Sequence, residues 1–237
     1  MAGRRLGKLM GGLALLAAAT PALRAETPAI LQRFFAIDDP APRSYRALRH
    51  LEAENGRFDS TAWMDVWTEA DATGFRYQIV AEEGSDYIRT RVFRETLKSE
   101  RAMWASGAPD RAGFTSENYI FEDRGSRTDG LACLIVKPRR KDVLLVDGSI
   151  FLDPHDGDLV RLEGRLSKSP SFWARRVDIV RRYRRIAGVR LPIDLESVAS
   201  LLIAGTSTFR MAYDYETVND LHVGDPQPRR ATYAASR

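Results

Sequence analysis

The chain has 237 residues, 44% of them hydrophobic, with 36 basic and 32 acidic side chains, one cysteine and three histidines. This composition is that of a globular protein and excludes collagen-like, disordered and disulfide-rich chains. Residues 1–25 hold four of the basic side chains and no acidic one, which leaves 32 of each sign in the rest. Because that remainder is neutral, it offers no electrostatic attraction to a phosphate backbone, and we expect no nucleic-acid partner.

Residues 1–25 have the plan of a secretory signal peptide. Arg4, Arg5 and Lys8 precede an apolar stretch over residues 9–19, which small residues follow. A stretch of about 11 residues is well short of the ~20 that a membrane-spanning helix needs. We therefore expect export and cleavage after Ala22 or Ala25; the alternative is a retained membrane anchor.

The first third of the mature chain predicts a short helix and then strands. Residues 28–37 place apolar side chains on one helical face. From Tyr45 onward the period is two, and residues 63–67 and 75–79 predict paired strands joined through residues 71–74.

One longer helix interrupts the strands. Ser85 can cap it, Asp86 favours its first turn, and Gly107 and Pro109 end it. Its apolar stripe contains Ile88, Val92, Phe93 and Leu97.

The rest of the chain again predicts strands. Residues 118–121 and 131–136 come first, and Asp-Gly pairs then predict two tight hairpin turns, at residues 147–148 and 156–157. Residues 173–183, 193–203 and 208–215 follow, with Gly188 and Pro192 marking a turn after the first of them. We expect one domain over residues 26–223 and a disordered tail over residues 224–237.

These elements predict a mainly β (α+β) fold with one antiparallel sheet of roughly ten strands, which must curl, close or split. A half-closed sheet needs its concave apolar face covered, and the two helices are available for that. An apolar hollow with a removable lid is suited to binding lipid.

No catalytic or metal-binding pattern is present. Two histidines never stand at ligand spacing, Cys133 lies in an apolar run typical of a buried thiol, and residues 153–158 fit a hairpin turn better than a calcium loop. Nucleophile-elbow and phosphate-loop motifs are absent. We expect no enzyme activity, no cofactor and no metal; the alternative is a hydrolase whose residues meet only in space.

Residues 175–185 form the densest basic stretch. It could dock anionic headgroups or an acidic partner surface, or it could be a solvated strand balanced by acids on neighbouring strands. The neutral composition favours the balanced strand.

Three features stand out across residues 30–219: the early helix, the Asp-Gly meander over residues 143–164, and Gly188 to Pro192 followed by two long strands. Together they resemble the LolA-like outer-membrane lipoprotein carrier superfamily. Residues 84–89, 118–121 and 169–173 resemble one poorly described branch of it.

The resemblance implies an incomplete β-barrel whose concave face is covered by helices, in a periplasmic monomer that binds lipid or the acyl chains of lipoproteins for outer-membrane lipoprotein sorting. An inner- or outer-membrane protein is a further possible partner. The alternative function is a periplasmic sensor or accessory module of the same fold that acts through a membrane protein. Family carriers also latch the lid with a cavity arginine, whose position the sequence does not give.

The expected cavity lining is aromatic and aliphatic: Trp63, Trp67, Phe75, Tyr77, Ile79, Phe121, Trp173, Ile179, Phe209, Met211 and Tyr213. The expected lid-helix residues are Ile88, Val92, Phe93 and Leu97.

Overall fold

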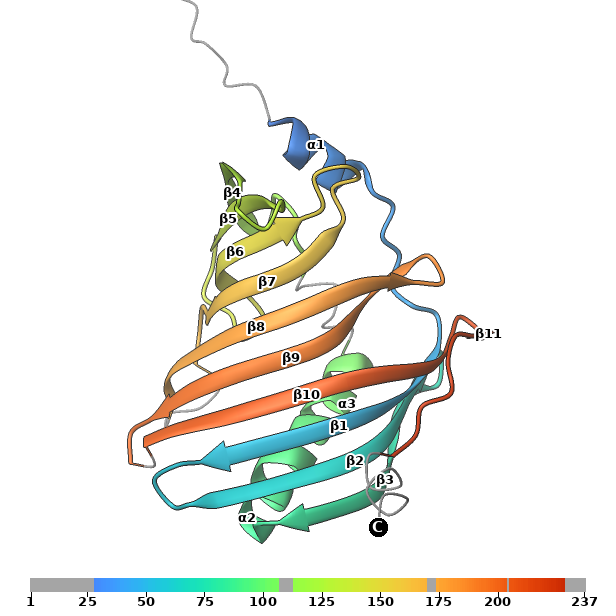
Figure 1. Cartoon of the computed structure of the whole chain (residues 1–237), viewed down its shortest axis with the longest axis vertical. Coiled ribbons are helices and arrows are strands. Elements are labelled where there is room, and N and C mark those ends of the chain that lie inside the picture. Colours follow the sequence, from blue (N-terminus) through green and yellow to red (C-terminus); the bar gives the residue numbers. More distant parts are fainter. Residues whose placement is uncertain (1–27, 107–112, 170–173, 204, 229–237) are drawn as a thin grey trace, which may run out of the picture.

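The computed structural model describes residues 28–106, 113–169, 174–203 and 205–228. Its strands form one 11-stranded antiparallel sheet in the order β3-β2-β1-β10-β9-β8-β7-β6-β5-β4, with β11 paired to β10. The strands are β1 Tyr45–Asn55, β2 Ser60–Asp71, β3 Gly74–Gly84, β4 Tyr119–Ser126, β5 Ala132–Pro138, β6 Val146–Leu152, β7 Leu159–Leu166, β8 Ala174–Ile186, β9 Val189–Leu201, β10 Gly205–Val218 and β11 Leu221–His222. The sheet curls without closing, as expected (Figure 1).

The two edge strands, β3 and β4, carry charged side chains. Arg76 and Glu83 on β3 are exposed, as are Asp123 and Arg124 on β4. Charges on an edge strand discourage pairing with another chain, which fits a sheet that stays open.

The Asp147-Gly148 pair does not form the predicted turn. β6 runs straight through it, and the turn before this strand lies at residues 143–144. A Cβ atom on Gly148 would lie 2.1 Å from the carbonyl oxygen of Glu163, so the glycine permits a close approach of β6 to β7. The prediction was wrong because a glycine needed for close strand contact looks the same in sequence as one needed for a turn.

The second Asp-Gly pair does lie between β6 and β7, but in a six-residue loop over residues 153–158 rather than in the predicted tight turn. Gly157 has a φ of +83° in the loop between β6 and β7, where its N–H donates to the carbonyl of Asp153 at 2.8 Å. Pro192, expected in a turn, lies inside β9 at a register irregularity opposite Tyr183. Such irregularities tolerate proline because they lack a regular ladder bond.

Two helical segments flank the sheet. α1 (Ala29–Ala36) packs its buried Phe34 near the β4–β7 half. The second is a 20-residue segment of α2 (Asp86–Ile88), the π-helix η1 (Arg89–Arg94) and α3 (Glu95–Ala105), which we call the lid. Ser85 caps it, accepting from the N–H of Ile88 at 3.5 Å. In the described part of the chain, no helix is long and apolar enough to span a bilayer.

Two buried clusters share the concave face of the sheet. One lies between the lid and strands β1–β3, β9 and β10, and the other covers β4–β8 and α1. Leu195 on β9 packs against both clusters, so β8 and β9 form the strip between them. Residues 224–228 carry no helix or strand; the expected signal peptide, Trp173 and residues 229–237 lie outside the described residues.

Candidate functional site

The concave face of β1 and its neighbours is set by strand alternation. Leu51 lies between Met64 on β2 and Met211 on β10, and all three side chains point to the lid. The same face carries Tyr45, Ala47, Ala62, Val66, Ala70, Phe75, Tyr77, Ile79, Phe209, Tyr213 and Tyr215. Alternation thus builds a continuous apolar surface on one side of the sheet.

The lid covers this surface with its apolar stripe. Phe93 and Leu97 are fully buried, Ile88 is nearly so, and Val92 packs beside them. The ring of Phe93 lies 6.1 Å from that of Phe209, and Trp104 lies 6.2 Å from Tyr45. The expected lid residues therefore face the sheet, and the hollow expected there is filled by lid side chains.

One arginine of the concave face is bonded to the lid. The Arg49 side chain is 2% exposed, and its guanidinium donates to both carboxylate oxygens of Glu100 on α3, at 2.5 and 2.8 Å. It also donates to the hydroxyl of Tyr45 at 2.8 Å and lies 4.6 Å from the ring centre of Tyr213. A bidentate pair of this kind fixes the position of α3 on the sheet.

This environment shifts the pKa values of its members. Burial raises the pKa of Tyr45, Tyr213 and Tyr215 above the usual value, against the opposing effect of Arg49. Burial disfavours the charge of Arg49 too, but Glu100 and the tyrosines keep its pKa well above the usual value. Arg49 therefore stays charged inside an apolar contact.

A second arginine lies on the concave face between the clusters. Arg181 on β8 is partly buried beside Tyr183, and within the described residues its buried Nε has no hydrogen-bond partner. It pairs in register with Leu162 and Leu195. An arginine between two leucines marks a polar position on an apolar strip.

Sequence reasoning missed the role of Arg49, although a signal was available. Tyr45, Ala47, Arg49, Leu51 and Ala53 occupy alternate positions of one strand, and the arginine is the charged member of an otherwise uncharged set. An arginine in the core-facing register needs a partner.

The expected lining residues divide between the faces of the sheet. Phe75, Tyr77, Ile79, Phe209, Met211 and Tyr213 meet under the lid, whereas Phe121 and Ile179 belong to the other cluster. Trp63 and Trp67 lie on the outer face of β2, which corrects their predicted place in the lining. Trp63 stacks 6.0 Å from His50, and the guanidinium of Arg46 lies 4.2 Å above Trp67.

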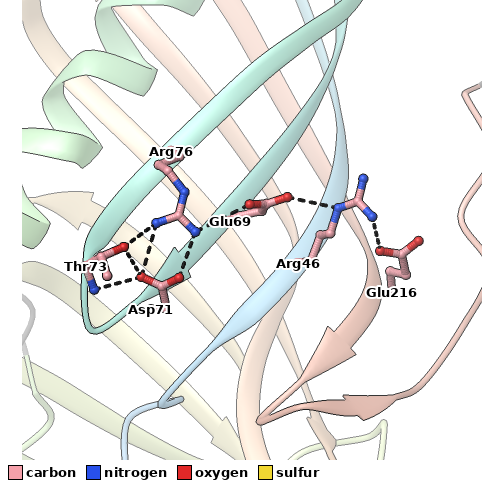
Figure 2. Close-up of polar contacts among 6 residues, drawn as sticks. All are labelled: Arg46, Glu69, Asp71, Thr73, Arg76 and Glu216. Atoms are coloured by element: carbon pink, nitrogen blue, oxygen red, sulfur yellow. Dashed lines mark hydrogen bonds and ion pairs between the residues drawn. The ribbon is translucent and has the colours of Figure 1, made fainter.

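Arg46 belongs to a chain of ion pairs on the outer face (Figure 2). It contacts Glu216 at 2.6 Å and Glu69 at 3.1 Å, and Glu69 in turn contacts Arg76 at 3.4 Å. Arg76 and Thr73 donate hydrogen bonds to Asp71 and hold its pKa below the usual value. These charged side chains are 26–50% exposed, so the face of the sheet that carries them and Trp67 borders solvent.

The outer face also carries a polar groove of about 370 Å³ across β1, β10 and β9. Its lining is His50, Glu52, Asp194, Glu196, Arg210 and Ala212. His50 lies 2.5 Å from the buried Asp65 and 2.8 Å from Glu52. Carboxylates dominate this groove, so it does not suit an acyl chain.

Three of the six arginines in the basic stretch, Arg176, Arg182 and Arg185, form ion pairs with acids. Arg182 contacts Asp194 and Glu196, and Arg185 contacts Asp158 and Asp39. These pairs agree with the balanced-strand interpretation rather than with a free basic docking strand.

No family model and no curated protein matches the chain. Several solved structures are similar to it, among them the following two. A domain described as outer-membrane lipoprotein-sorting, from Vibrio parahaemolyticus, has 11% identity and a TM-score of 0.39, over 79% of this chain and 91% of that one. A LolA superfamily protein from Nitrosomonas europaea has 10% identity and a TM-score of 0.36, over 85% and 94%.

Proposed function

We propose that the chain is a periplasmic carrier that shelters a lipid, or the acyl chains of a lipoprotein, on the concave face after the lid moves away. The observation that supports this most is the Arg49–Glu100 pair inside an otherwise apolar contact. A buried ion pair contributes little net stability compared with apolar side chains of similar size. Such a pair adds little to the free energy of lid closure but fixes the position of the closed lid. These two properties suit a lid that must close in one position and open again.

The free energies of burying the lid side chains and of burying an acyl chain can be compared. Burying Ile88, Phe93 and Leu97 stabilises the closed state by roughly 5–9 kcal/mol, at ~1.5–3 kcal/mol each. An acyl chain of about fifteen methylenes gains roughly 12 kcal/mol from the same surroundings, at ~0.8 kcal/mol per methylene. The cargo gain exceeds the lid contribution by about 3–7 kcal/mol, so exchanging the lid for cargo favours binding and costs far less than exposing the concave face to water.

The lid has a feature suited to movement. Its middle segment is a π-helix, a rare geometry that occurs frequently at functional sites. Arg89 and Arg94 of this segment both form ion pairs with Glu82 on β3, which attach the lid to the sheet at a second point.

The direct test measures bound lipid. Protein purified from the periplasm is extracted for mass spectrometry, and the purified protein is titrated with a fluorescent fatty acid. We expect co-purified lipid and saturable binding. Absence of both, in the wild type and in Glu100→Gln with its weakened lid contact, would reject the proposal.

A matched pair of variants locates the site. Phe209 lies on the concave face of β10 and is partly exposed, whereas the adjacent Thr208 is exposed on the outer face. Phe209→Lys places a charge where the acyl chain would lie and should weaken probe binding at least tenfold. Thr208→Lys, the control on the same strand, should leave it unchanged.

A further inference from the structure

The two ends of the antiparallel sheet differ in their surface chemistry. One end carries the β1–β2 turn, the β9–β10 turn, the β5–β6 loop and residues 167–169 after β7, and we call it the Phe58 end. The opposite end carries the β2–β3, β6–β7 and β8–β9 turns (Figure 1). The strand register fixes which turn belongs to which end.

Large apolar side chains project from the turns of the Phe58 end. Phe58 in the β1–β2 turn is 60% exposed and Ile203 in the β9–β10 turn is 62% exposed. Leu202 beside Ile203 and Val143 in the β5–β6 loop are exposed too. Within the described part of the chain, nothing covers these side chains, and apolar side chains gathered on an exposed surface mark an interaction site.

The two apolar turns are held together and in shape. The side chain of Arg57 donates to the carbonyl of Ile203 at 2.5 Å. The side-chain oxygen of Asn55 accepts from the N–H groups of Arg57 and Phe58 at 3.2 and 3.1 Å, and its amide donates to Ser207. Phe58 is therefore presented from an ordered turn.

Unpaired cations lie at the same end of the sheet as these apolar side chains. Five exposed bases lie at the Phe58 end and form no ion pair among the described residues: Arg57, Arg139, Lys141, Lys168 and Arg175. Aspartates are more numerous at the opposite end, where Asp38, Asp39, Asp153, Asp156, Asp158 and Asp220 lie, although Asp59 and Asp142 belong to the Phe58 end. The chain without residues 1–25 is neutral, so this separation makes it polar along its strands.

We propose that the Phe58 end docks on the surface of an anionic bilayer. Phe58, Leu202 and Ile203 enter the headgroup boundary, and the five bases face lipid phosphates. The apolar side chains stand on projecting tips rather than in a groove, which suits a fluid surface better than a protein knob. The aspartates at the far end point away from the negative membrane. This docking goes beyond cargo binding and does not depend on it.

The test is flotation of the exported protein, purified from the periplasm, with vesicles. We expect binding to phosphatidylcholine vesicles with roughly one third phosphatidylglycerol, and at least tenfold weaker binding to phosphatidylcholine alone. Binding should also fall at about 0.5 M salt, which screens the phosphates.

Variants assign the binding to this end. Phe58→Ser with Ile203→Ser, and separately Arg57→Glu with Lys168→Glu, should each weaken binding at least tenfold while urea unfolding stays near wild type. Leu221→Ser is the control, because Leu221 is 58% exposed at the opposite end. Wild-type protein that fails to float, tip variants that bind normally, or equal loss in the control would each overturn the proposal. Flotation reports docking and extracted lipid reports cargo, so the two proposals fail separately.

Discussion

One guanidinium nitrogen of Arg49 lies 2.5 Å from Oε2 of Glu100, and the other lies 2.8 Å from Oε1. This contact joins the middle of the sheet to the lid across an apolar interface. The lid can therefore be weakened by a change of one atom in Glu100, without removing any apolar contact.

Glu100→Gln should lower the free energy of unfolding by about 3 kcal/mol, because it leaves Arg49 buried without a counter-charge. Amides of α3 should exchange faster, whereas those of β1 and β10 should change little. Urea unfolding and hydrogen exchange provide the measurements. Unchanged exchange of α3 would mean that the pair does not hold the lid.

Leu97→Ala should lower the free energy of unfolding by about 3 kcal/mol, since the side chain is fully buried between lid and sheet. Lys98→Ala, one position along and exposed, should cost less than about 1 kcal/mol. Chemical denaturation of both variants compares them. Equal effects would show that the lid does not pack as described.

Gly148→Ala should destabilise the sheet by roughly 3 kcal/mol, because its Cβ would meet the backbone of Glu163 and Gly164. Gly56→Ala is the control, since a Cβ there meets nothing within 4 Å. Thermal unfolding followed by circular dichroism distinguishes them. A Gly148 variant as stable as the control would argue against the close approach of β6 and β7.

Stability should decline in alkaline solution. Burial raises the pKa of Tyr45, Tyr213 and Tyr215 in the folded state, so above about pH 10 the unfolded chain releases protons that the folded chain retains. Their contribution is complete below about pH 10 and is lost as pH rises toward the folded values. Urea unfolding near pH 8 and near pH 11 measures the decline, which Tyr45→Phe should reduce. An equal slope in that variant would mean that Tyr45 does not contribute.

Alternation and helix signals predicted the curled sheet, the early helix and the lid stripe, because strand and helix periods are local properties. It was harder to predict which side chains of β2 face the concave side, because apolar side chains occupy both sets of alternate positions. Trp63 and Trp67 are the largest, but Ala62, Met64 and Val66 are the set that faces the lid. Arg49 escaped notice because its partner is 51 residues away on α3. Long-range pairing of this kind leaves no periodic trace.

The lid lies between two strands, β3 and β4, that never pair with each other. The described part of the segment between them forms the lid helix and adds no strand that would pair β3 with β4 and close the barrel. Displacing the lid therefore breaks side-chain contacts but no backbone hydrogen bond between strands. Substitutions in the lid can thus change the free energy of lid opening, while the eleven-stranded sheet still unfolds as one cooperative unit.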